Sequence, residues 1–197
     1  MPLIKSNRRS LTTFTGTIKA QAVTLGTPLS ISWAALGANT LLGGLLNQFG
    51  IVPRTERGLW GILFAPFLHA NVAHLAANSI SLLILGWLTL AFAGRRTFWI
   101  VSASAALGAG LCAWTFGAPG TVHIGASGVI FGLAAYLILA GFMMRRWQAA
   151  LVAVVLVVLF GGMFYGVLPQ EGPVSWESHL SGALAGVWAA RRHHPRT

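Results

Sequence analysis

Residues 124–143 read IGASGVIFGLAAYLILAGFM, a stretch without a single charged side chain. A helix needs about 20 apolar residues to cross the hydrocarbon core of a bilayer, so this stretch predicts a membrane-spanning helix. The same stretch opens with a serine between glycines, Gly125-Ala126-Ser127-Gly128. This stretch therefore indicates both the class of fold and the position of a candidate functional site.

Other parts of the chain repeat this apolar character. Hydrophobic residues make up 55% of the 197 residues, charged residues 8%, and the mean hydropathy is +0.72. This composition lies outside the range of soluble globular proteins. Further apolar stretches occupy residues 24–47, 72–93, 97–116, 148–168 and 177–190. The sequence therefore predicts an all-α polytopic membrane protein, a bundle of six transmembrane helices.

The basic residues predict how these helices are oriented. All of the 13 Lys and Arg residues except Arg54 and Arg57 lie before the first stretch, between the second and third, between the fourth and fifth, or after the sixth. Cytoplasmic loops are enriched in Lys and Arg, so both termini are expected in the cytoplasm. The expected organisation is a short tail over 1–20, a membrane domain over 21–190 and a basic tail over 191–197. Because the +10 charge is divided into short groups beside the helices, it does not predict nucleic-acid binding.

Polar residues converge at one depth in this arrangement. The stretches that begin near residues 72, 124 and 177 all start on the outer side, and polar groups at membrane depth are costly and usually functional. The residues concerned are His69, His74, Asn78, Ser127 and His179.

A serine and a histidine suggest nucleophilic catalysis. A serine hydroxyl attacks only when a neighbouring base takes its proton, and histidine suits that role near neutral pH. The chain contains no Asp, and Glu177 is two residues from His179, so the two would not face each other on a helix. A Ser127–His179 dyad is therefore predicted, in apolar surroundings that favour the neutral imidazole a base requires.

Two further features would complete such a site. His74 and Asn78, four residues apart on one helix face, and the Ser127 N–H at a helix start are candidate donors to an oxyanion. Small residues spaced by four let helix backbones approach closely, which would bring Ser127 toward His179. The glycines expected on these contact faces are Gly125, Gly128 and Gly132 in one stretch and Gly182 and Gly186 in another.

Metal sites, disulfides and other protease mechanisms are less well supported, because the residues that they need are missing or poorly spaced. His69 and His74, five apart, would point roughly 140° away from each other on a continuous helix, which is a poor geometry for one metal ion. The lone Cys112 cannot form an intrachain disulfide and is expected to be a packing residue. The absence of Asp excludes an aspartyl protease, and Gly128 directly after Ser127 departs from the Gly-x-Ser-x-Gly elbow. No metal or cofactor is expected, and His123 is expected to be a loop histidine without a chemical step.

From about Arg57 to Ala190, the chain resembles the rhomboid family of intramembrane serine proteases. The family pattern His-x4-His-x3-Asn reads here as His69, His74 and Asn78; Gly-x-Ser-Gly as Gly125, Ser127 and Gly128; and His-x2-Gly-x3-Gly as His179, Gly182 and Gly186. Each of these residues alone has a simpler interpretation, since a lone serine usually bonds to its own helix. The combination of three motifs in order favours the resemblance.

The resemblance implies roles for particular residues. Ser127 would be the nucleophile, His179 the general base and acid, and His74 and Asn78 oxyanion donors together with the Ser127 amide. His69 would line the site, and Phe131 stands where many members carry a tyrosine that stacks on the catalytic histidine. Family members often have Trp-Arg in the first outer loop, whereas Gly61 follows Trp60 here, which leaves open whether Arg57 substitutes.

The implied activity is cleavage of a peptide bond in or near a transmembrane segment of a membrane-protein substrate. The protein would lie in a bacterial plasma membrane, with residues 148–168 and the loop to Ser178 as a moving gate. Two alternatives remain: a catalytically inactive rhomboid-like protein that binds membrane proteins, and a transporter of a small solute or metal.

Overall fold

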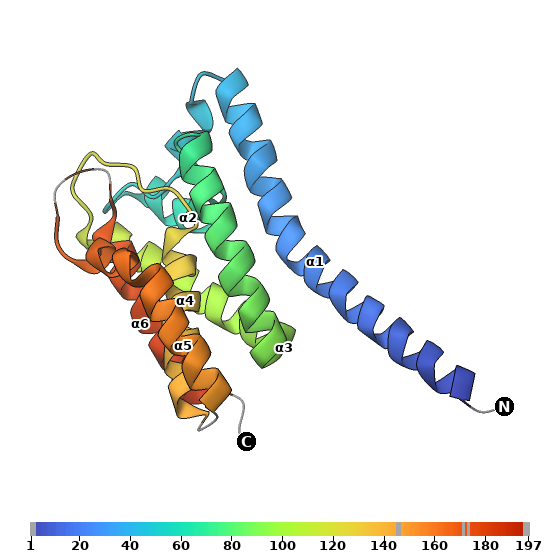
Figure 1. Cartoon of the computed structure of the whole chain (residues 1–197). Coiled ribbons are helices and arrows are strands. Elements are labelled where there is room, and N and C mark those ends of the chain that lie inside the picture. The colour runs from blue at the N-terminus through green and yellow to red at the C-terminus, as the bar shows by residue number, and fades with distance from the viewer. Residues whose placement is uncertain (1–2, 145–146, 171, 173, 195–197) are drawn as a thin grey trace.

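The fold is a bundle of helices, seen in a computed structural model that describes residues 3–144, 147–170, 172 and 174–194 (Figure 1). These residues form six α-helices and no β-strand; one isolated antiparallel bridge pairs Ile51 with His123. The helices are α1 (Leu3–Leu41), α2 (Glu56–Phe64), α3 (Val72–Phe116), α4 (Ser127–Met143), α5 (Trp147–Phe160) and α6 (Trp176–His193). Short 3-10 helices follow α1, α2 and α5: η1 (Leu45–Phe49), η2 (Ala65–Phe67) and η3 (Gly161–Val167).

Helix α3 contains two of the predicted helices. Its backbone breaks from helical geometry at Gly94, where φ is 81° and ψ is 170°. This left-handed φ is easy for glycine and costly for other residues. The stretches 72–93 and 97–116 are thus two arms of α3 that meet at Gly94. Among the described residues, α3 is the one helix that is long and apolar enough to cross a membrane by length and composition, while α4 and α5 are shorter apolar helices.

Helix α1 differs from its prediction at both ends. It begins at Leu3 rather than near residue 24, and Figure 1 shows its first turns projecting away from the other helices. Hydropathy marks only the apolar part of a helix, and the polar residues before it contain no proline that would end the helix. The expected boundary between a tail and a membrane domain at residues 20 and 21 is therefore not an end of a helix. At the other end, Gly43 and Gly44 adopt left-handed φ angles of 63° and 91° and stop α1 before residue 47.

Helix α6 extends into the segment predicted as the basic tail. Helix α6 continues through residues 191–193, which were expected to belong to a separate tail, and residues 195–197 lie outside the described part of the chain.

The connection between α1 and α3 is folded, which the sequence did not predict. The Thr55 side chain caps α2 by accepting a hydrogen bond from the Gly58 amide at 3.0 Å. Arg54 donates from Nη1 to the Thr115 carbonyl at 2.8 Å, and Trp114 Nε1 donates to the Thr55 carbonyl at 2.8 Å. Arg54 therefore ties this connection to the end of α3, whereas Arg57 is exposed on α2.

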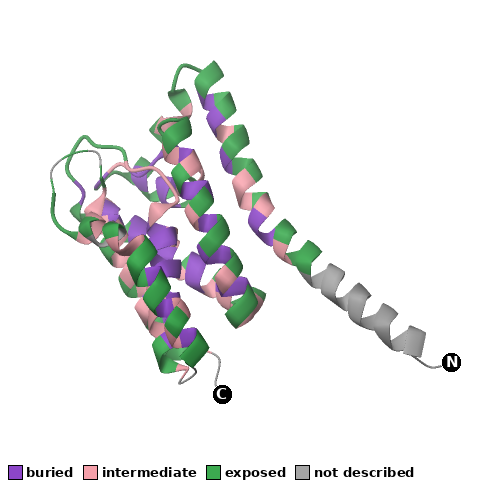
Figure 2. Cartoon of the chain, in the orientation of Figure 1, coloured by how far each residue is buried: buried purple, intermediate pink, exposed green. Residues whose placement is uncertain are grey.

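The core is centred on α4, as the buried colouring in Figure 2 shows. A helix that is apolar all round is expected to be enclosed by others. On α4, Ile130, Leu133 and Tyr136 are almost completely buried, whereas on α5 only Ala149, Ala153 and Leu156 are buried. Helix α4 is thus held firmly between α3 and α6, and α5 lies at the edge.

Glycines set the separation of α4 and α6. A methyl group on Gly182 would overlap the carbonyl of Gly128, and one on Gly186 would overlap the carbonyl of Gly132. The two backbones are therefore in direct contact, as the small-residue spacing predicted. This contact fixes the first turns of α4 and α6 beside each other.

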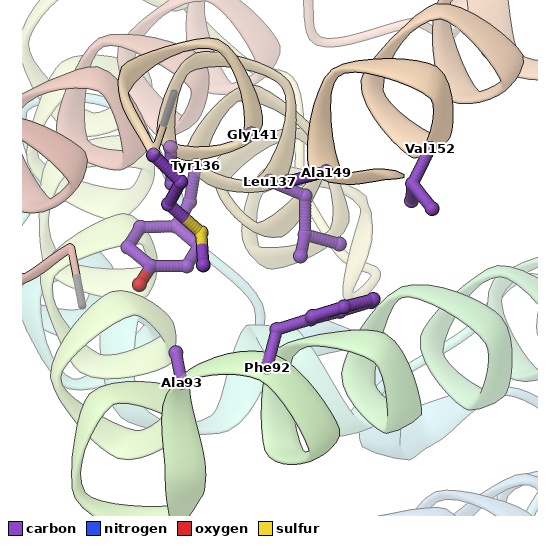
Figure 3. Close-up of a pocket in the computed structure, with 9 residues that line it drawn as sticks. Phe92, Ala93, Tyr136, Leu137, Gly141, Ala149 and Val152 are labelled. Atoms are coloured by element: carbon purple, nitrogen blue, oxygen red, sulfur yellow. The ribbon is translucent and has the colours of Figure 1, made fainter. Parts of the chain in front are cut away.

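A small cavity of about 20 Å³ lies at the C-terminal end of α4, between α3, α4 and α5 (Figure 3). Its lining side chains are apolar apart from the hydroxyl group of Tyr136, and include Phe92, Leu137 and Val152. Polar groups suited to catalysis gather instead at the N-terminal end of α4.

Candidate active site

Ser127 and His179 meet where α4 and α6 begin. Ser127 is the first residue of α4, and His179 lies in the first turn of α6. The Ser127 Oγ is 2.8 Å from His179 Nε2, a hydrogen-bonding distance. The glycine contact between the two helices accounts for this proximity, since it holds both helix starts at one level.

The other ring nitrogen of His179 has a backbone partner that the sequence analysis missed. His179 Nδ1 lies 3.0 Å from the carbonyl oxygen of Gly166, in η3. A carbonyl can only accept, so Nδ1 must carry the hydrogen in this contact. In the neutral ring, Nε2 is then free to accept the hydroxyl hydrogen of Ser127. No side-chain pattern could have revealed this partner, because every residue has a carbonyl.

An aromatic ring holds the imidazole from one side. The rings of Phe131 and His179 are stacked, with centroids 4.2 Å apart and planes inclined by 14°. Phe131 lies one turn after Ser127 on α4, so one helix supplies both the serine and the stacking ring. Stacking orients the imidazole without adding a hydrogen bond.

Candidate donors to an oxyanion surround Gly125. A methyl group on Gly125 would lie 2.8 Å from the His74 ring and 3.5 Å from Asn78 Nδ2, so both side chains face this residue. Asn78 is buried, and its Nδ2 has no hydrogen-bond partner among the described residues. An unpaired buried donor costs free energy, and active sites are among the places where it is tolerated. The space beside Gly125 and Ser127 thus has donors directed at it.

Gly125 has a different place from the one predicted. It precedes α4 rather than lying on the α4–α6 contact face, and its φ of 114° strongly favours glycine. Its amide donates to the Ala65 carbonyl at 2.8 Å, which attaches the segment before Ser127 to η2. Its lack of a side chain makes room for His74 and Asn78.

His69 lies in the loop before α3, and its side chain is 1% exposed. Its ring meets the His74 ring edge to face at a centroid distance of 5.0 Å, so the expectation that the two rings point apart is wrong. That expectation assumed one continuous helix. The described residues contain no group of three or more His, Cys, Asp or Glu positioned for a metal ion.

A larger cavity adjoins these donors. It has a volume of about 380 Å³ and lies between α1, α2, both arms of α3 and the start of α4. Its walls are mainly apolar, with Leu29, Leu82 and Phe98 among them, and Asn78 and His69 add polar groups. The volume lies within the usual range of ligand pockets.

Comparison with known proteins identifies the family to which this chain is similar. The family model of the Rhomboid domain matches residues 56–196. An uncharacterized protein of Mycobacterium tuberculosis is 44% identical over 158 residues, which cover 76% of this chain and 65% of that protein. An uncharacterized protein of Mycobacterium leprae is 45% identical over 141 residues, 67% of this chain and 55% of that protein. Rhomboid-like protein 11, chloroplastic, of Arabidopsis thaliana is 32% identical over 137 residues, 62% of this chain and 48% of that protein. The chain thus spans less than two thirds of the length of these relatives.

Proposed function

This chain belongs to the rhomboid family and is an integral membrane protein, and we propose that it is an intramembrane serine endopeptidase. The family includes intramembrane proteases and inactive relatives. One observation carries the choice between them: a continuous hydrogen-bonded series from the Ser127 hydroxyl through the His179 ring to the Gly166 carbonyl. An inactive relative has no need to keep the nucleophile, the base and the partner that sets the tautomer in contact.

The first step is acylation of the serine. As Ser127 Oγ bonds to the carbonyl carbon of the substrate, its hydrogen passes to His179 Nε2. Negative charge then develops on the substrate oxygen, where Asn78 Nδ2, His74 and the Ser127 amide are the donors. The imidazolium gives its proton to the leaving nitrogen as the C–N bond breaks. The amine product departs, and an ester joins Ser127 to the other part of the substrate.

Hydrolysis of this ester completes the cycle. His179 takes a proton from a water molecule, whose oxygen attacks the ester carbonyl. The proton then returns to Ser127 Oγ as the ester bond breaks and the carboxylic acid product forms. Every proton is exchanged through His179 Nε2, so the Gly166 contact at Nδ1 keeps the same tautomer for both halves of the reaction.

The substrates of this enzyme are transmembrane proteins. A substrate helix must unwind locally to present a peptide bond, because its backbone groups are otherwise paired. Helix α5 and η3, with the loop to Ser178, form the gate at the edge of the bundle. Since η3 contains Gly166, movement of the gate would also affect the hydrogen bond to His179.

The family and the charge pattern both support a proposal for the location of the protein. The protein lies in a bacterial plasma membrane with both termini in the cytoplasm, because the basic residues flank the predicted cytoplasmic helix ends. The active site then opens toward the outer face.

A fluorophosphonate probe tests the proposed chemistry, because it reacts with an activated serine hydroxyl. In detergent micelles, we expect covalent labelling of the full chain, loss of labelling in Ser127→Ala and a strong decrease in His179→Ala. Cleavage of a model transmembrane substrate should follow the same order. A well-folded wild type that neither labels nor cleaves would show instead an inactive family member, and chelator-sensitive transport that survives Ser127→Ala would favour a transporter.

A further inference from the structure

A second histidine links the two segments that carry Ser127 and His179. His123 lies in the loop between α3 and α4, and its Nδ1 is 2.7 Å from Ser175 Oγ, just before α6. Ser175 Oγ is 2.8 Å from Ser178 Oγ. On its other side, His123 Nε2 is 2.9 Å from Thr121 Oγ1. The series therefore runs from the loop before Ser127 to the residue before His179.

The hydroxyl hydrogens determine the direction of these hydrogen bonds. Thr121 uses its only hydroxyl hydrogen on the Ala118 carbonyl at 2.6 Å, so His123 Nε2 must donate to Thr121. In the neutral ring, Nδ1 then accepts the hydroxyl hydrogen of Ser175. Burial lowers the pKa of His123 below its ordinary value, against a smaller opposing effect of the Glu177 carboxylate, and this favours the neutral ring.

The surroundings leave His123 little freedom. Its backbone exchanges two hydrogen bonds with Ile51, at 2.9 and 3.0 Å. A methyl group on Gly117 would lie 2.6 Å from His123 Nε2, so the ring packs directly against that residue. A cavity of about 30 Å³ is lined by His123 and Ser175 and also by Ser127. The linked residues and the nucleophile thus border one small space.

We infer that His123 is a positioning residue for the Ser127–His179 pair, acting through its hydrogen bond to Ser175. The inference rests on the proposed protease function. The α4–α6 glycine contact fixes the distance between the helix axes, whereas the His123–Ser175 bond joins the two segments at the level of the reacting atoms. Small misplacement of reacting groups is costly in rate, so this bond controls the chemical step rather than probe binding.

Two substitutions of His123 test the contributions of its two ring nitrogens separately. An Asn amide lies near the position of Nδ1, whereas a Gln amide reaches the position of Nε2. We therefore expect His123→Asn to keep the Ser175 contact and His123→Gln to lose it. For fluorophosphonate labelling of the full chain, the maximal inactivation rate should fall about 10- to 100-fold in His123→Gln and much less in His123→Asn, with the probe binding constant unchanged.

The hydrogen bond between His123 and Ser175 can also be removed by a substitution at Ser175. Ser175→Ala leaves the His123 ring and its Thr121 contact in place, and it should reproduce the loss of rate. The double variant His123→Gln/Ser175→Ala should be no slower than either single variant, because both remove one shared interaction. His193→Asn, at the far end of α6, is the matched control and should label at the rate of the wild type.

Each possible result of these labelling experiments either supports or contradicts the inference about His123. If His123→Gln and Ser175→Ala fold but label at the rate of the wild type, or if His123→Asn is as slow as His123→Gln, the positioning role is wrong and the protease function stands. If the fluorophosphonate probe does not label the wild type, both the positioning role of His123 and the proposed protease function are wrong. Thermal unfolding of each variant identifies a loss of rate that comes from misfolding, and Ser175→Ala then gives the deciding measurement if His123→Gln fails to fold.

Discussion

At the scale of single residues, the unusual feature is the partner of His179. The Gly166 carbonyl holds Nδ1 at 3.0 Å and defines the tautomer, but it carries no full charge. Hydrogen bonds to charged groups are stronger than those between neutral groups, so a carbonyl stabilises an imidazolium less than a carboxylate would. The stacked ring of Phe131 supplies a second restraint on the orientation of His179.

The buried amide of Asn78 gives a prediction at this scale. Asn78→Ala removes a donor whose Nδ2 has no partner among the described residues, so the transition state loses a hydrogen bond that the resting enzyme does not use. We expect cleavage of a model transmembrane substrate to slow by about 10²–10³ in kcat with little change in KM. Steady-state kinetics in micelles measure both constants.

Ser79→Ala is the control for Asn78, because Ser79 is a buried polar residue at the same depth of α3. It should leave kcat within about threefold of the wild type, since its hydroxyl already donates to the Leu75 carbonyl and accepts from Trp33 Nε1. An unchanged kcat in Asn78→Ala would remove Asn78 from the oxyanion donors.

At the scale of helices, the direct contact of α4 and α6 positions the site. Gly182 and Gly186 meet the carbonyls of Gly128 and Gly132, so any side chain there must separate the helices. Helix α5 has a single contact of this kind, where a methyl group on Gly141 would lie 2.8 Å from the Ala149 carbonyl, and it buries only three of its residues. This difference suits the roles proposed above, in which α4 and α6 form a rigid pair that carries Ser127 and His179, and α5 is part of the gate.

Gly182→Ala tests whether the direct contact of α4 and α6 positions the site. The added methyl group overlaps the Gly128 carbonyl, and overpacking of this kind costs about 1–3 kcal/mol of unfolding free energy. We expect a lower unfolding temperature and a large loss of fluorophosphonate labelling, because α6 carries His179 away from Ser127.

The matched control for Gly182 is Gly26→Ala on α1, where an added methyl group would meet nothing within 4 Å. It should leave labelling unchanged and stabilise the helix by about 0.5–1 kcal/mol. Equal labelling of the two variants would show that the glycine contact does not position the site.

At the scale of the whole molecule, the starts of α4 and α6 and the first turns of α3 gather at one end of the bundle. The prediction of an all-helical membrane bundle of the rhomboid family is confirmed. The arrangement brings together residues up to 110 positions apart, from His69 to His179.

The orientation of the molecule is testable with single cysteines. In a Cys112→Ser background, Ala118→Cys lies in the exposed loop before α4, and Thr97→Cys lies where the two arms of α3 meet. We expect a membrane-impermeant maleimide to modify Ala118→Cys in intact bacterial cells and Thr97→Cys only after permeabilisation. The reverse pattern would place the active site on the cytoplasmic side, and a permeant maleimide should modify both variants.

The spacing of residues in sequence predicted much of the candidate site. The motif glycines Gly128 and Gly182 meet, and Ser127 begins its helix. These two features follow from helical periodicity, which depends on local spacing. The stacking of Phe131 on His179 was implied by the resemblance to the rhomboid family. The position of Gly125 was predicted incorrectly, because an apolar stretch does not reveal within a few residues where a helix begins.

The sequence by itself determined the class of the protein, its apolar helices and the candidates for the proposed nucleophile, base and oxyanion donors. Composition and side-chain spacing carry that information, because hydrophobic burial and helix geometry act on each segment separately. The tertiary structure alone decided the Gly166 partner of His179, the Arg54 anchor and the His123–Ser175 link. These depend on backbone carbonyls and on loops that meet only after the helices pack, so no local pattern encodes them.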